Sequence, residues 1–75
     1  MITPQIHIEN PLLGTKYEFY KTYRLLVKDI PRVMCEYGVK SIFVVRSRRG
    51  QWGEWFERWE MDYRCKPFIV KKGWS

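Results

Sequence analysis

The sequence predicts a small two-layer α+β domain of the order β-α-α-β-β-β, in which a kinked or split helix packs on a mostly antiparallel sheet. Three observations predict this class. Residues 15–37 carry apolar side chains at helical spacing, residues 39–48 and 54–72 are rich in β-branched and aromatic side chains, and the segments between them are short. With 75 residues the chain has the length of a single domain, residues 1–75, with a small core.

Residues 3–8 are predicted to form the first strand. Ile6 and Ile8 alternate with His7, and Pro11 limits the strand on its C-terminal side. Alternation with a period of two is typical of a strand, so we expect the two isoleucines on one face and His7 on the other.

A helix is predicted to begin at the capping-box pattern Thr15-Lys-Tyr-Glu18, in which the threonine oxygen caps the first turn and the glutamate reaches back to the cap. Apolar residues then recur at the spacing of one helical face, and polar residues gather on the other. The predicted buried face consists of Phe19, Tyr23, Leu26, Val27 and Ile30. The predicted opposite face consists of Tyr17, Lys21, Arg24 and Lys28.

Pro31 predicts a break or kink of this helix near residues 28–30, because proline has no backbone N–H and disfavours helical geometry in the residue before it. Asp29 is a suitable N-cap for a second, short helix over residues 32–37. Gly38 supplies the left-handed residue that ends it. We therefore expect two helical segments.

Two further segments read as strands with little ambiguity. Residues 39–48 have the β-branched and aromatic composition of a central strand, and residues 49–53 look like the turn that follows it. Residues 68–72 are predicted to form the last strand. Because Lys71 and Lys72 discourage unwanted strand pairing, we place this strand at an edge of the sheet.

Residues 54–65 fit two templates. A strand aligns one face, with only Glu57 out of pattern, made of Trp55, Trp59, Met61, Tyr63 and Cys65. A helix aligns a different set, made of Trp52, Trp55, Phe56, Trp59 and Tyr63. We favour the strand, because β-branched residues and a glycine-flanked turn precede it. The direction of the Trp55 face stays open: it is core if it lies under the helices, and a platform for a partner if it faces away.

Composition and spacing argue against catalysis and against a bound metal or cofactor. His7 is the only histidine, and Cys35 and Cys65 lack the paired spacing of zinc modules. We expect no enzymatic activity, no cofactor and no metal, and we expect the two cysteines to be buried free thiols. The acidic residues of the ambiguous segment are expected to be solvated or salt-bridged, namely Glu54, Glu57, Glu60 and Asp62.

The chain lacks the sequence features of a targeted or membrane-inserted protein. Its first residues have neither the basic start nor the long apolar run of a signal peptide. The longest unbroken apolar run, residues 42–45, is far shorter than a membrane span. We therefore expect a cytoplasmic protein with no membrane partner.

The net charge of +6 is unevenly distributed. Residues 38–53 contain four basic residues and no acidic one, whereas residues 54–62 contain four acids and one arginine. The acidic segment follows the basic one directly, so pairing across the intervening turn is expected to neutralise part of the positive field. A high net charge alone is therefore weak support for nucleic-acid binding.

The arginine turn, defined as Arg46, Arg48 and Arg49, is the main functional candidate because Trp52 and Trp55 follow it closely. Arginines suit contact with phosphates, and tryptophans suit stacking on unpaired bases. We predict a small non-enzymatic nucleic-acid-binding protein with little sequence specificity, for DNA or RNA. The basic face of the predicted helix would extend this surface through Lys21, Arg24 and Lys28.

A second hypothesis is a protein–protein interaction module, either an adaptor or an inhibitor of a larger protein. Tryptophan, tyrosine and arginine are the residues that dominate binding energy at protein interfaces. The same Trp/Tyr-rich surface would then dock on the partner, as a monomer or as a homodimer.

Overall fold

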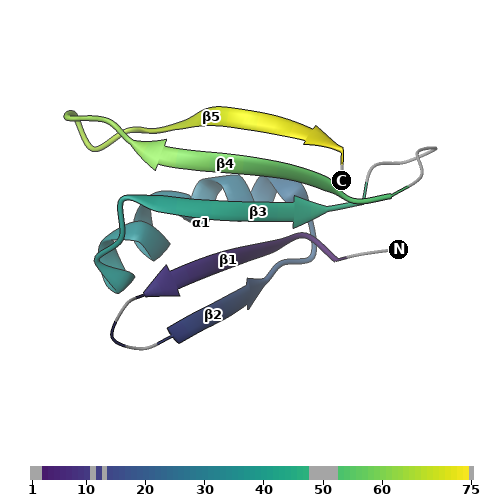
Figure 1. Cartoon of the computed structure of the whole chain (residues 1–75), viewed down its shortest axis with the longest axis horizontal. Helices are drawn as coiled ribbons and strands as arrows, with labels where there is room; N and C mark the ends of the chain where they lie inside the picture. The colour runs from purple at the N-terminus through teal and green to yellow at the C-terminus, as the bar shows by residue number, and fades with distance from the viewer. Residues whose placement is uncertain (1–2, 11, 13, 48–52, 75) are drawn as a thin grey trace.

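The structure is a computed structural model that describes residues 3–10, 12, 14–47 and 53–74. Over these residues the chain forms five strands and one helix, in the order β-β-α-β-β-β (Figure 1). The elements are β1 (Gln5–Asn10), β2 (Gly14–Phe19), α1 (Tyr23–Tyr37), β3 (Ser41–Arg46), β4 (Trp55–Met61) and β5 (Pro67–Trp74).

The strands form one antiparallel sheet in the order β2-β1-β3-β4-β5. β1–β2, β3–β4 and β4–β5 are hairpins, and α1 carries the chain from β2 at one edge back to β3 in the middle. α1 lies behind the sheet in Figure 1, and the face toward the viewer carries no described helix. The predicted two-layer α+β class is confirmed.

The core lies between α1 and the sheet face that it covers. Strand residues reach this face at alternate positions, and α1 contributes one stripe of its surface. The buried apolar side chains are Ile6, Ile8, Ile42, Val44 and Trp59 from the sheet and Leu26, Ile30, Val33 and Met34 from α1. Burying each aliphatic side chain contributes roughly 1.5–3 kcal/mol, so these residues hold the two layers together.

The helix predicted to begin at Thr15 is wrong: this segment is β2, an edge strand paired with β1. A helix and a paired strand both satisfy the backbone groups of this segment, so the capping-box pattern does not decide between them; in the structure residues 14–19 pair with β1 along its whole length. Glu18 accepts a hydrogen bond from the hydroxyl of Tyr37. The actual N-cap is Thr22, whose Oγ1 accepts from the backbone N–H of Leu25 at 3.2 Å.

The predicted split at Pro31 is also wrong, because α1 runs through it without interruption. A proline inside a helix costs about 3 kcal/mol. Buried residues on both sides of Pro31 anchor the two halves to the same sheet face, and their burial offsets this cost. Asp29 therefore caps no second helix. Its carboxylate instead accepts hydrogen bonds from Arg32 and Tyr20.

Most of the remaining elements follow the prediction. Gly38 ends α1 in the left-handed conformation, with φ of 65°. The strand interpretation of residues 54–65 is confirmed over β4, and the helical alternative is wrong. Residues 62–65 lie beyond β4 in the turn before β5, so Tyr63 and Cys65 are not on the strand face predicted for them. β5 is the predicted last strand at a sheet edge. Its pairing with β4 is irregular between Arg58 and Trp59.

Candidate functional site

The sheet face opposite α1, called the open face below, carries a continuous row of rings and charges. Its members are neighbours in the register of adjacent strands. Along each strand, the residues before and after a member of the row point to the opposite face of the sheet. This central row, from β2 to β5, consists of Tyr17, His7, Phe43, Arg58 and Lys71. Tyr17 is 52% exposed and Phe43 is 38% exposed, so both rings are accessible from solvent.

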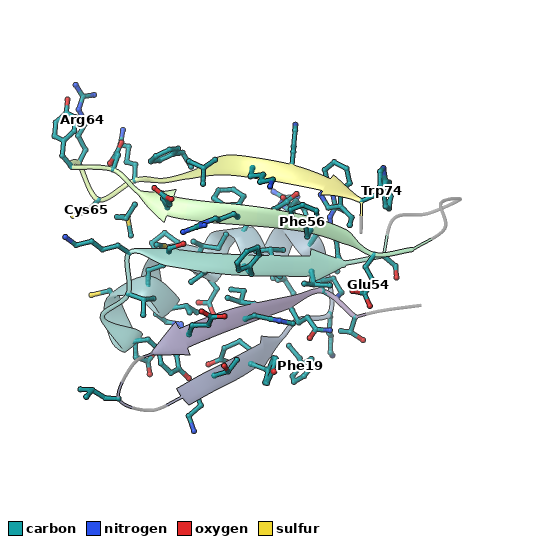
Figure 2. The ribbon with its side chains drawn as sticks, viewed as in Figure 1. Phe19, Glu54, Phe56, Arg64, Cys65 and Trp74 are labelled. Atoms are coloured by element: carbon teal, nitrogen blue, oxygen red, sulfur yellow. The ribbon has the colours of Figure 1, made fainter. Side chains whose placement is uncertain are left out.

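A second row runs beside the first, toward the end of the sheet where β4 begins. The same strand pairing places its members in line, and they are Phe19, Gln5, Val45, Phe56 and Gly73. Gly73 lies close to the ring of Phe56. A Cβ at position 73 would be only 3.5 Å from Cε1 of that ring. Figure 2 shows Phe19 and Phe56 toward the same end of the sheet. The open face is therefore a broad aromatic surface.

The rings of the central row are ordered by their neighbours. His7 and Tyr17 pack edge to face, with centroids 4.7 Å apart, and His7 Nε2 lies 2.7 Å from Oε1 of Gln5. Burial lowers the pKa of His7 below its usual 6.5, and the Glu54 carboxylate partly opposes this shift. At neutral pH His7 is therefore an uncharged flat ring between two aromatic residues.

Arg58 is held in place on the open face by its own contacts. Its Nε donates a hydrogen bond of 3.1 Å to Oγ of Ser41 and lies 3.7 Å from Oε2 of Glu60. The guanidinium carbon lies 5.9 Å from the centroid of the Phe43 ring. A cation directly beside an exposed ring is the arrangement that contacts a phosphate while the ring stacks on the neighbouring base.

Trp55 and Trp59 lie on the face of β4 that is opposite to Arg58. Trp59 is 8% exposed and lies in the core, and Trp55, four residues earlier on the same face, is half-buried. Between them Glu57 is only 3% exposed, and its carboxylate accepts hydrogen bonds from both indole N–H groups and from the hydroxyl of Tyr23. The Trp55 face therefore lies toward α1. The expectation that Glu57 is solvated or salt-bridged is wrong.

Arg46, the member of the arginine turn that the structure describes, lies on the side of the sheet toward α1. Arg46 is half-buried at the end of β3, and its guanidinium carbon lies 3.8 Å from the centroid of the Tyr23 ring. Trp55 donates to Glu57 and packs edge to face on Trp74, with centroids 5.0 Å apart. The other predicted members of this site, Arg48, Arg49 and Trp52, lie outside the described residues.

The three predicted helix cations lie in the other layer. Arg24 and Lys28 are exposed on α1, and Lys21 is exposed just before it. The tertiary structure thus separates them from the central row by the thickness of the domain. Tyr23 in the first turn of α1 contacts Arg46, so the start of the helix lies near the end of β3.

Sequence reasoning missed most of the open face. The predicted helix over the segment of Tyr17 and Phe19 concealed that both rings lie on a sheet, and the composition that predicts a central strand over residues 39–48 does not say which way Phe43 points. The available signal was alternation: Phe43 stands between Ile42 and Val44, which are both buried, so it must face the other side.

The described residues show no cluster of three or more His, Cys, Asp or Glu side chains that is placed to bind a metal ion. Cys35 and Cys65 are free thiols, and both are exposed, so the expectation that they are buried is wrong. Within the described part of the chain, no helix has the length and apolar character needed to cross a membrane.

Neither the protein-family models, nor the curated proteins, nor the solved structures contain a match to this chain. The open face is therefore the feature of the chain that points to a function.

Proposed function

We propose that the protein binds single-stranded nucleic acid, with little sequence specificity, on the open face of its sheet. The central row supports this proposal, because it places accessible rings next to Arg58 and Lys71. Every base has a flat face that stacks on an aromatic ring, and the cations contact the phosphates between bases. Rings that lie on a sheet are reached by unpaired bases and not by a closed duplex.

The segment between β3 and β4 carries Arg48 and Arg49, which fit the same proposal as sources of phosphate contacts, whereas Arg46 lies on the side toward α1 against Tyr23. This segment connects the two strands that carry Phe43 and Arg58. We assign Arg48 and Arg49 this role from their sequence, and we transfer the stacking role from Trp55 to the rings of the open face, because Trp55 lies on the side toward α1.

The test is a fluorescence-anisotropy titration of labelled single-stranded and duplex oligonucleotides at low and near-physiological salt. We expect salt-dependent binding that is tighter for single strands. Phe43→Ala should raise the Kd about 5- to 150-fold, since one base stack is worth roughly 1–3 kcal/mol. Arg58→Gln should lower the slope of log K against log salt by about 0.7, the value for one phosphate contact on a single strand.

Two controls make the result specific to the open face. Leu25→Ala removes an apolar side chain that is 50% exposed in the helical layer, and it should leave the Kd unchanged. Replacing Lys21, Arg24 and Lys28 together by alanine should weaken binding less than Arg58→Gln does. If the wild-type protein binds no oligonucleotide at low salt, the proposal is wrong. If only the helix cations matter, nucleic acid binds on the other layer.

The second candidate function is self-association, and the charge pattern of β2 favours it. β2 is an edge strand, and its residues 14–17 are exposed. If two copies pair antiparallel about a two-fold axis at Tyr17, each Lys16 lies opposite Glu18 of the other copy. This pairing would join two open faces into one continuous surface.

Size-exclusion chromatography with light scattering tests the dimer. Lys16→Glu would place like charges opposite each other and should give a monomer, whereas the double exchange Lys16→Glu with Glu18→Lys should restore the dimer. A wild-type protein that stays monomeric at high concentration rules out this assembly.

A further inference from the structure

The open face contains a hollow of about 220 Å³, next to the place where the pairing between β1 and β3 ends. The pairing between these strands runs only to His7 and Phe43, although β1 continues to Asn10 and β3 begins at Ser41. The side chains and backbone around the gap line a pocket next to the middle of the central row. It is lined by His7, Glu9, Ser41, Ile42, Phe43 and Arg58.

We propose that this hollow is a ribose-binding subsite, which makes the protein select RNA over DNA. The inference rests on the proposed binding of single strands to the open face. The hollow is smaller than the roughly 300 Å³ at which pockets for drug-sized ligands begin, so it suits one sugar and not a whole dinucleotide.

The polar groups of the hollow recognise hydroxyl groups better than phosphates. Glu9 is an exposed carboxylate at its rim, and a carboxylate repels a phosphate but accepts a hydrogen bond from a sugar hydroxyl. Ser41 already accepts a hydrogen bond from Nε of Arg58, which leaves its own O–H as a donor. A sugar 2′-hydroxyl both donates and accepts, so it complements this pair.

The surroundings of the hollow fit the rest of a nucleotide. Phe43 forms one side and presents its ring on the open face, where the attached base would stack. Arg58 forms another side, and Lys71 lies directly beyond it on β5, so the phosphate that follows the sugar meets cations there. Because rings continue along β1 and β2 through His7 and Tyr17, and Phe56 lies in the neighbouring row, the ligand is a strand and not a single nucleotide.

The experiment compares three labelled probes of one sequence by fluorescence anisotropy: oligouridylate, its 2′-deoxy form, and its 2′-O-methyl form. The 2′-deoxy probe lacks the hydroxyl, and the 2′-O-methyl probe cannot donate from it. We expect oligouridylate to bind about tenfold more tightly than either, the effect of one hydrogen bond to a charged acceptor. The readout is the ratio of Kd values.

Variants at the rim then assign the preference to the hollow. Glu9→Ala removes both the acceptor and a negative charge, so oligouridylate should lose its hydrogen bond while the 2′-deoxy probe does not, and the ratio should fall toward one. Glu9→Gln keeps a neutral acceptor oxygen and should lower the ratio less. Glu36→Gln removes the same charge from the helical layer, where Glu36 is exposed, and should leave the ratio unchanged. Circular dichroism of each variant verifies that it is folded.

The outcomes separate the subsite from the proposed function. If oligouridylate and its 2′-deoxy form bind equally well, the ribose subsite is wrong while binding to single strands stands. The same conclusion holds if the preference survives both Glu9 variants. If none of the probes binds at low salt, the proposed function itself fails.

Discussion

The hydroxyl of Tyr23, in the first turn of α1, donates a hydrogen bond of 2.6 Å to Oε1 of Glu57 in the middle of β4. The same carboxylate accepts from the indole of Trp59 at 2.9 Å and from the indole of Trp55 at 2.8 Å. A buried carboxylate is tolerated only when hydrogen bonds replace its hydration, and here donors from both layers do so. Glu57 thus ties the helix to the sheet and orients the tryptophans.

Removing this acceptor should be among the most destabilising single changes in the chain. Glu57→Ala leaves three buried or half-buried donors without their acceptor, and each such loss costs about 1–3 kcal/mol. We expect urea unfolding to show a loss of about 3 kcal/mol or more. Glu57→Gln keeps one acceptor oxygen and should lose less. Glu60→Gln, on the open face, is the matched control, and a Glu57→Ala variant as stable as this control would contradict the role of Glu57.

Pro31 offers a change in the opposite direction. It lies inside α1 and is exposed, so an alanine there restores a backbone N–H without disturbing the core. We expect Pro31→Ala to raise the free energy of unfolding by about 1–3 kcal/mol, because proline is about 3 kcal/mol less favourable than alanine in a helix interior. Arg32→Ala, at the next exposed position, should give no gain. Equal or lower stability of Pro31→Ala would mean that the helix has adapted to proline.

Gly38 is the glycine whose backbone conformation matters most for the path of the chain. It adopts φ of 65° after α1, and its N–H and that of Val39 bond to carbonyls of the last helical turn. A Cβ at this position would meet no atom within 4 Å, so the cost of Gly38→Ala is conformational alone. We expect a loss of about 1–2 kcal/mol, measured by thermal unfolding. Gly38→Asn should lose less, because asparagine tolerates this conformation better.

His7 predicts how stability depends on pH. Its pKa is lowered by burial in the folded chain and has its usual value of 6.5 in the unfolded chain. Below pH 6.5 the unfolded state therefore binds more protons, and the free energy of unfolding falls as the pH decreases toward the folded pKa. We expect the urea midpoint to drop as the pH falls from 7 through 6.5 and toward the lowered folded pKa.

The matched variant for this prediction is His7→Gln, which should show a smaller drop over the same range. Asp29 does not contribute in this window. Its pKa is lowered, chiefly by the hydrogen bond from Arg32, so its stabilising effect is lost only as the pH falls below its usual 3.8. The same pH dependence in wild type and His7→Gln would show that other groups are responsible.

Local patterns predicted the elements whose side chains repeat with one clear period. Alternation around Ile6 and Ile8 predicted β1, the spacing of Leu26 and Ile30 predicted the buried stripe of α1, and Gly38 predicted its end. These features depend on backbone geometry over a few residues, which neighbouring residues already specify.

The errors arose where a local pattern is compatible with two structures. Thr15 and Glu18 can cap a helix, yet they also alternate with Tyr17 along an edge strand, and pairing with β1 selects the strand. Pro31 disfavours a helix locally. However, the continuous helix keeps buried residues on both sides of Pro31, and this burial offsets the cost of the proline.

The candidate site shows the same division. Composition shows that rings and cations are abundant, and both templates for residues 54–65 place Trp55 and Trp59 on one face. The packing of α1 directs this face toward the helix, while Phe43 and Arg58 lie on the other side beside His7. The physical reason is that a strand has two faces of equal local geometry, and the one that is buried depends on where the helix packs.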